Sequence, residues 1–223
     1  CPLALPCCTV LWLLPGRAVW WPEARSLFVA DVHFGKAASF RHGGQPVPTG
    51  TTADNIARLD TLLTTTGAQR LVFLGDFLHA RGGAQPALWQ QLRGWRARHA
   101  QVAMDLVLGN HDRHAGTPPA DLNIALQEEP WAPVPGVPLR AAHHPQAVAG
   151  HTVLAGHLHP SVVLHGPARD RMRLPCFAWQ PGPQGLLVLP AFGAFTGTHA
   201  NALPAGARPY AIAGTRVVQV PGG

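Results

Sequence analysis

The chain alternates short apolar runs with polar segments, and three of these runs stop abruptly at an oxygen-bearing side chain. The runs at 26–31 (SLFVAD) and 70–76 (RLVFLGD) end in aspartate, and the run at 102–110 (VAMDLVLGN) ends in asparagine. Continuous apolar runs of this length favour strands that are buried on both faces. Two earlier runs, at 9–14 and 18–21, flank a Pro-Gly turn signal and predict a hairpin.

Two segments between the buried runs carry apolar positions at helical spacing, which predicts helices over 52–70 and 86–99. The apolar positions are Ile56, Leu59, Leu62 and Leu63 in the first segment and Leu88, Leu92 and Trp95 in the second. The order strand, helix, strand, helix, strand is typical of an α/β sheet whose neighbouring strands run parallel.

The rest of the chain predicts a second sheet. Residues 115–138 are rich in loop signals and hold six of the 23 prolines. Short strands or hairpins are then predicted at 138–144, 152–159, 185–192 and 208–220. No stretch has the composition of a domain linker, so we expect one domain over residues 1–223, with the second sheet packed on the first.

Charge and cysteine usage indicate what partners and what cellular compartment to expect. The chain has 17 basic and 11 acidic residues, a net charge of +6 that favours polyanionic partners such as nucleic acid. The four cysteines form no CxxC pair, which favours a reducing, cytoplasmic compartment over a disulfide frame or a cysteine zinc site. No apolar stretch is long enough to span a bilayer, and the proline-interrupted opening segment does not resemble a signal peptide.

Polar motifs follow five of the predicted strands, in an order that suggests metal binding. They are ADVH (30–33), GD (75–76), GNHD (109–112), AHHP (142–145) and GHLH (156–159). In open α/β sheets, sites form at the carboxyl ends of strands, so these motifs can converge. Side chains two apart on an extended backbone share a side, so the Asp-x-His and His-x-His pairs should each face one centre.

Seven side chains in these motifs are candidate metal ligands: Asp31, His33, Asp76, Asn110, His143, His157 and His159. Two divalent ions roughly 3.5–4 Å apart would use them all, with one carboxylate between the ions. Oxygen and nitrogen donors without thiolate favour Mn²⁺, with Fe or Zn²⁺ as alternatives. Each motif alone would fit a solvated loop or a turn; their joint order makes coincidence improbable.

The ordered motifs resemble the signature of the calcineurin-like metallophosphoesterase superfamily. The resemblance implies an α/β fold of two packed mixed β-sheets flanked by helices, a four-layer αββα sandwich. A narrower resemblance, to the ligase-associated DNA-damage-response endonucleases, covers most of residues 10–220. It is carried by residues 30–52, 74–83, 154–160 and 189–197. In bacteria these enzymes are encoded beside an ATP-dependent DNA ligase and a helicase.

The resemblance also implies roles for individual residues. Asp31, His33 and His159 would hold one ion, Asp76 would bridge, and Asn110, His143 and His157 would hold the other. We prefer His143 to His144 because the family commonly has Glu at the second position. His111 would act on the leaving oxygen. His79 stands where many members carry an acid that supports this histidine, so what orients His111 stays open, with Asp112 as a candidate.

The remaining predictions concern the substrate, which we expect to be single-stranded or flapped DNA. Candidates for substrate contact near the predicted metal motifs are Lys36, Arg41, His79, Arg81 and Arg113. Phe34 and Phe40 are candidates for stacking on unpaired bases, whereas Trp89 and Trp95 sit at core spacing. Alternatives are the same chemistry on a small or lipid phosphodiester, a pyrophosphate, a cyclic nucleotide or a phosphoprotein, and a non-catalytic scaffold of the same fold.

Overall fold

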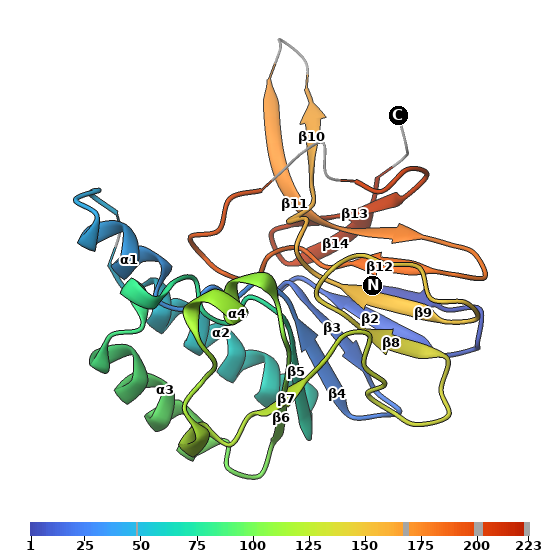
Figure 1. Ribbon diagram of the computed structural model, residues 1–223. Helices are drawn as coiled ribbons and strands as arrows, with labels where there is room; N and C mark the ends of the chain where they lie inside the picture. The colour runs from blue at the N-terminus through green and yellow to red at the C-terminus, as the bar shows by residue number, and fades with distance from the viewer. Residues whose placement is uncertain (48, 167–169, 199–202, 221–223) are drawn as a thin grey trace.

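The structure is a computed structural model that describes residues 1–47, 49–166, 170–198 and 203–220. Two β-sheets pack face to face at its centre (Figure 1). In the first sheet the strands lie in chain order, antiparallel from β1 to β4 and parallel from β4 to β7. They are β1 (Pro2–Ala4), β2 (Val10–Leu14), β3 (Ala18–Trp21), β4 (Ser26–Val29), β5 (Arg70–Leu74), β6 (Ala103–Val107) and β7 (Ala125–Gln127).

The second sheet is built from the last third of the chain, in the order β14-β13-β11-β12-β9-β8. Strands β8, β9 and β12 run parallel, and the others are antiparallel to their neighbours. The outer half of β11 leaves this sheet to pair with β10. The strands are β8 (Leu139–Ala141), β9 (Thr152–Ala155), β10 (Ser161–His165), β11 (Arg171–Gln180), β12 (Leu186–Val188), β13 (Arg208–Ala213) and β14 (Arg216–Gln219).

The described helices all lie in the half of the chain that forms the first sheet. They are α1 (Lys36–His42), α2 (Thr51–Thr66), α3 (Pro86–Arg98) and α4 (Asn110–Ala115), with 3₁₀ turns η1 (Arg81–Gly83) and η2 (Ala120–Leu122). Helices α2 and α3 pack their predicted apolar faces on one side of the first sheet (Figure 1). No helix in the described ranges, given above, has the length and apolar character to cross a bilayer.

The packing of the core explains why the strands are apolar along their whole length. Between the sheets, Phe28, Val72 and Leu74 pack against Leu154 and Phe177 of the opposite sheet, all fully buried. Burying each such side chain contributes about 1.5–3 kcal/mol to folding. Neighbouring positions on β4 and β5 face the helices instead, so both faces of these strands are apolar.

The sequence predicts a fourth layer, made of helices, on the outer face of the second sheet, and the structure differs there. The buried residues of this face, among them Val153, Ala155 and Val188, pack against side chains of connecting segments such as Val148 and Leu158. In the described part of the chain, loops therefore take the place of helices on this side. The two mixed sheets flanked by helices are otherwise the α/β sandwich that the sequence predicts.

Candidate active site

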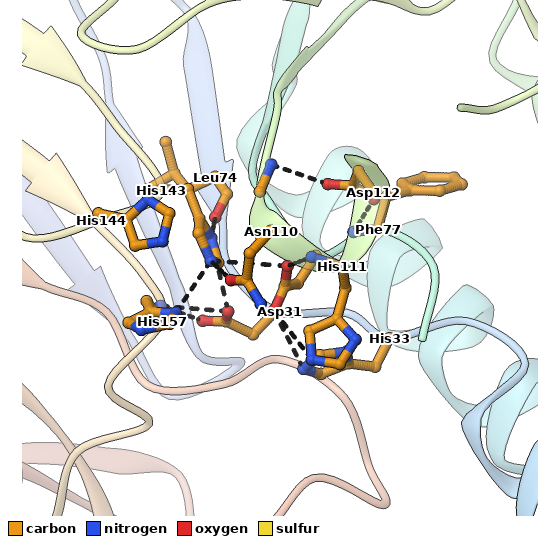
Figure 2. A network of polar contacts seen from close by, with 12 residues as sticks. Asp31, His33, Leu74, Phe77, Asn110, His111, Asp112, His143, His144 and His157 are labelled. Atoms are coloured by element: carbon orange, nitrogen blue, oxygen red, sulfur yellow. Dashed lines mark hydrogen bonds and ion pairs between the residues drawn. The ribbon is translucent and has the colours of Figure 1, made fainter. Parts of the chain in front are cut away.

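The polar motifs converge at the edge where parallel strands of both sheets end (Figure 2). Asp31 follows β4, Asp76 follows β5, and Asn110 opens α4 just after β6. From the second sheet, His143 follows β8, and the His-x-His pair follows β9. An isolated parallel bridge between Ala30 and Ala191 links the chain after β4 to the chain after β12.

Two carboxylates and three imidazoles form the buried half of the site. His159 Nε2 lies 3.5 Å from Asp31 Oδ1, and His33 Nε2 lies 3.7 Å from Asp76 Oδ2. His143 Nε2 lies 3.5 Å from Asp76 Oδ1. Donor atoms of Asp31, His33 and His159 lie within 4.8 Å of one another, as do those of Asp31, Asp76 and His143. Ligands about 2.0–2.2 Å from one ion fit such spacings.

Asn110 and His157 complete the cluster on the other side of His143. The Asn110 side-chain oxygen lies 2.9 Å from His143 Nε2, and His157 Nδ1 lies 3.1 Å from the same nitrogen (Figure 2). The backbone N–H of His157 donates to both oxygens of Asp31, at 3.1 and 2.9 Å. The structure thus brings together all seven side chains predicted as metal ligands.

The backbone that presents these ligands is not extended, so the prediction of extended Asp-x-His and His-x-His pairs was wrong. Asp31, His33, Asp76, His157 and His159 all have positive φ, between 49° and 71°. Non-glycine residues adopt such conformations at a cost of roughly 1–3 kcal/mol and keep them where surrounding structure enforces them. The strands also stop earlier than predicted, so the ligands lie on tight loops just beyond the strand ends.

Glycines before three of the ligands let the segments approach closely. A Cβ on Gly75, whose φ is +76°, would overlap the imidazole of His143. A Cβ on Gly109 would lie 2.5 Å from Asp76 Oδ1, and one on Gly156 would lie 2.7 Å from Asp31 Oδ2. The Gly in each of the GD, GN and GH motifs therefore makes room for a ligand from another strand.

The electrostatics favour a cation. Burial lowers the pKa of His33 to about 2, with the charges of Lys36 and His159 adding to the effect, and burial lowers the pKa of His143 and His157 too. These imidazoles are therefore neutral, as metal ligands must be. Burial and the nearby charge of Asp31 raise the pKa of Asp76 to about 6, a repulsion that a bound cation relieves.

The donor set passes a chemical test for divalent metal. Nε2 of His33, of His143 and of His159 each lies 3.5–3.7 Å from a carboxylate oxygen, beyond the usual hydrogen-bond length but close to the spacing of two ligands on one ion. The ligand atoms are carboxylate, amide oxygen and imidazole, with no thiolate near them in the described residues. Such a set suits Mn²⁺, Fe or Zn²⁺.

His111 lies at the open side of this cluster. Its Nδ1 is 2.7 Å from the carbonyl oxygen of His79, and its Nε2 is 3.9 Å from Asp76 Oδ2. A carbonyl only accepts, so Nδ1 carries a proton and Nε2 is the atom that faces the cluster. The ring also stacks on that of His79 at a centroid distance of 5.2 Å. His79 thus supplies the contact that orients His111.

Asp112 braces the turn by binding backbone N–H groups with both of its carboxylate oxygens. Its Oδ1 accepts the N–H groups of Phe77 and Leu78 at 2.9 and 3.2 Å, and its Oδ2 accepts that of Gly109 at 3.0 Å (Figure 2). Burial raises the pKa of this carboxyl to about 6 despite the three donors. The sequence left Asp112 as a candidate for orienting His111; its contacts instead brace the backbone of the turn, next to that histidine.

The predicted substrate contacts fall in different places. Lys36 is half-buried at the start of α1, where burial lowers its pKa while the charges of Asp76 and Asp31 act to raise it, so it lies within electrostatic range of both carboxylates. His79 lies between His111 and Phe40, whose ring stacks on it at 5.7 Å. Arg41 is exposed on α1 and lines a pocket of about 200 Å³ with Gly35 and Thr51.

The other candidates for substrate contact are paired with an acid, buried, or have a side chain that the structure does not describe. Arg113 forms an exposed ion pair with Glu128 at 2.6 Å. The side chain of Arg81 lies outside the described residues. Phe34 is fully buried against Phe77 and cannot stack on a base, which leaves Phe40 of the two candidates.

Glu129 supports the site, although the sequence motifs did not single it out. Its Oε2 accepts the backbone N–H groups of His143 and His144 at 2.7 and 2.8 Å, and its Oε1 lies 2.6 Å from His144 Nδ1. Burial acts to raise the pKa of Glu129, but these hydrogen bonds outweigh it and the pKa is lowered. The signal in the sequence was His144 itself, because a histidine at the position of the family's Glu leaves a carboxylate to be supplied from elsewhere.

Solved structures of other proteins share this architecture, whereas neither a protein-family model nor a curated protein matches the chain. The crystal structure of Pseudomonas putida nuclease MPE is 42% identical, with 99% of each chain covered and a TM-score of 0.82. YfcE, a phosphoesterase from E. coli, is 17% identical over 87% of this chain and 97% of that one, with a TM-score of 0.44. From the identity to nuclease MPE over nearly the whole of both chains, this chain belongs to the calcineurin-like metallophosphoesterases, hydrolases of phosphoester bonds.

Proposed function

We propose that this protein is a nuclease that hydrolyses phosphodiester bonds in DNA at a centre of two divalent metal ions. The observation that carries the proposal is the convergence of seven oxygen and nitrogen donors beside His111 at one strand edge. The 42% identity to a nuclease over 99% of both chains supports the same substrate class. Manganese is the proposed native metal, because this donor set is rich in carboxylate and imidazole.

The side chains of the site would have separate roles in the reaction. Asp31, His33 and His159 would hold one ion, Asp76 would lie between the two, and Asn110, His143 and His157 would hold the other. When bound, the ions supply Lewis acidity toward the phosphoryl oxygens and a water activated near neutral pH. His111, whose Nε2 faces the cluster, delivers a proton to the leaving oxygen. Lys36 places a positive charge beside the phosphate.

Single-stranded or flapped DNA is the proposed form of the substrate. The net charge of +6 supports a polyanionic ligand, and the side chain of His111 is 38% exposed, so solvent reaches the site. We further propose that the enzyme acts in DNA repair, in the cytoplasm, alongside an ATP-dependent DNA ligase and a helicase. That part of the proposal rests on the resemblance carried by residues 30–52 and 189–197.

The test combines a DNA circle with a small ester. The protein is incubated with Mn²⁺ and circular single-stranded DNA, and in parallel with bis-p-nitrophenyl phosphate. We expect the circle to be cut, which establishes endonucleolytic cleavage, and we expect Asp76→Asn to abolish both activities. Turnover of the small ester with an intact circle would exclude endonucleolytic cleavage of single-stranded DNA and favour a small phosphodiester. Metal binding with no turnover of either would favour a scaffold.

A further inference from the structure

A two-stranded ribbon rises from the body of the protein (Figure 1), and its first strand begins just after the His-x-His pair. It consists of β10 and the outer half of β11, paired antiparallel from Ser161↔Pro175 to His165↔Arg171. Beyond Pro175, β11 re-enters the second sheet, where Cys176 pairs with Ala211 of β13. The ribbon thus extends past the strand edge at which the ligands gather.

The two faces of the ribbon have opposite character. The register places Val162, Leu164, Met172 and Leu174 on one face, of which all but the exposed Met172 pack on the cluster around Cys176 and Ala211. The other face carries His165, Arg171 and Arg173, all exposed, with Val163 and Pro175 as its apolar residues. We call this second face the basic face.

The positive charges on the basic face are not neutralised within the ribbon. His165 and Arg171 stand directly opposite each other across the strands, so the cross-strand neighbour of Arg171 is an imidazole and not a carboxylate. No carboxylate of the described residues lies within 4.0 Å of the guanidinium of Arg171 or Arg173. A surface that places cations side by side without acids between them fits an anionic ligand.

The basic face begins at the metal site. β10 starts two residues after His159, and His159 Nδ1 lies 3.1 Å from the carbonyl oxygen of Gly197. Arg173 donates to the next carbonyl oxygen, that of Thr198, at 3.4 Å. Arg171 lies two residues before Arg173 in β11, about 7 Å further from the body of the protein. The two guanidiniums therefore form a line that leads outward from a metal ligand.

We propose that the basic face, formed by His165, Arg171 and Arg173, binds the phosphate backbone of single-stranded DNA that runs into the metal centre. The inference rests on the proposed function and adds the surface that holds the strand outside the scissile bond. A row of cations with little apolar area suits a polyanionic strand better than a bilayer, which requires buried apolar side chains. Guanidinium groups are well suited to phosphate because they donate in a fixed fork.

The test separates strand binding from chemistry. Affinity for a fluorescent oligothymidylate is measured by anisotropy over a series of salt concentrations, and turnover of bis-p-nitrophenyl phosphate is measured on the same preparations. For Arg171→Ala with Arg173→Ala we expect affinity to fall about tenfold or more, and the salt slope to fall by about 0.7 for each phosphate that the variant no longer binds. Turnover of the small ester should stay unchanged, which also shows that the variant is folded.

A matched control variant loses the same number of positive charges at another place on the surface. Arg25→Ala with Arg208→Ala removes two exposed arginines at the strand ends opposite the site, and should bind DNA like the wild type. Arg171→Ala alone, which leaves the hydrogen bond to Thr198 intact, should show an intermediate loss of affinity. Arg171→Lys with Arg173→Lys keeps both charges and should restore the salt slope, with only the part of the affinity that depends on the guanidinium fork lost.

Each outcome decides between the two proposals. Wild-type cleavage of DNA with unchanged binding by the ribbon variant would overturn the ribbon and leave the nuclease standing. A wild type that turns over the small ester but neither binds nor cuts DNA would overturn both. Sedimentation with phosphatidylserine vesicles that depends on Arg171 and Arg173, without DNA binding, would assign the basic face to a membrane instead.

Discussion

The carboxylate of Glu129 holds His143 by its backbone, through the 2.7 Å hydrogen bond from the His143 N–H to Oε2. The same carboxylate holds His144, whose ring packs edge-on against that of His143 at a centroid distance of 4.6 Å. His144 also lies 4.6 Å from the ring of His157. One acid from a distant loop therefore fixes two of the proposed ligands, one directly and one through His144.

Replacing Glu129 with glutamine should weaken metal binding. The amide is neutral, so its oxygen accepts the two backbone N–H groups more weakly than a carboxylate, and its N–H₂ donor forces Nδ1 of His144 to become an acceptor. Loss of such a supporting partner typically costs 10–100-fold in metal affinity. Isothermal titration of the metal-free protein with Mn²⁺ measures this. Glu128→Gln, next in the chain and exposed, is the matched control and should bind Mn²⁺ normally. Equal affinities would refute the role.

Adding a single methyl group at Gly75 should disrupt the centre. The new Cβ would overlap His143 and would have to adopt a φ of +76°, which costs an alanine about 1–2 kcal/mol before any clash. We expect Gly75→Ala to lose Mn²⁺ binding and to unfold at lower denaturant concentration. Gly94→Ala is the control, because a Cβ there meets nothing within 4 Å inside helix α3. That substitution should stabilise the protein by roughly 0.5–1 kcal/mol. Tight metal binding by Gly75→Ala would contradict the crowding argument.

The parts of the fold that follow from apolar patterning were predictable. Strands β4, β5 and β6 are buried on both faces, so their sequences are continuous apolar runs that stop where the chain leaves the core. Helices α2 and α3 lie within four residues of their predicted ends because their buried positions repeat at helical spacing. The motifs after the strands identified side chains that the structure brings together, because the carboxyl ends of parallel strands share one edge.

The rest depends on contacts between distant residues, which no local pattern records. The left-handed backbone at His157 and His159 is imposed by packing, since neither residue favours it on its own. Glu129 lies 14 residues from the ligand that it holds, in a loop with no periodicity. The ribbon of β10 and β11 was missed because the alternating stretch of β11 is only four residues long, and Pro175 interrupts it at mid-strand.

Acid should weaken the contact between helices α2 and α3 at Asp60. Its carboxylate lies 2.6 Å from His99 Nε2 and 3.0 Å from Arg98 Nη2. Burial acts to raise the pKa of Asp60, but these partners outweigh it and lower the pKa. A lowered pKa stabilises the fold above the unfolded value of about 3.9, and the contribution is lost as the pH falls through the folded value.

The free energy of unfolding of Asp60→Asn should therefore lie below that of the wild type near neutral pH. The difference in free energy of unfolding between the variant and the wild type should become smaller as the pH falls below about 4. Urea unfolding over a pH series measures it. Asp121→Asn, which breaks the half-exposed pair with Arg93, should show a smaller gap because exposed pairs contribute little. A gap that widens in acid would reverse the sign of the argument.

Removing the imidazole of His111 should separate metal binding from turnover. His111→Ala keeps the backbone N–H that donates to Asp76 Oδ1 at 3.0 Å, so we expect Mn²⁺ affinity to be retained. Turnover of DNA should fall by roughly 10²–10⁴, the usual contribution of a general acid, because the alkoxide leaving group needs a proton. Bis-p-nitrophenyl phosphate should lose much less, since p-nitrophenolate leaves without one. His151→Ala removes an exposed imidazole before β9, at the end of that strand opposite the site, and serves as the control. Full DNA cleavage by His111→Ala with normal metal content would remove this residue from the proton transfer.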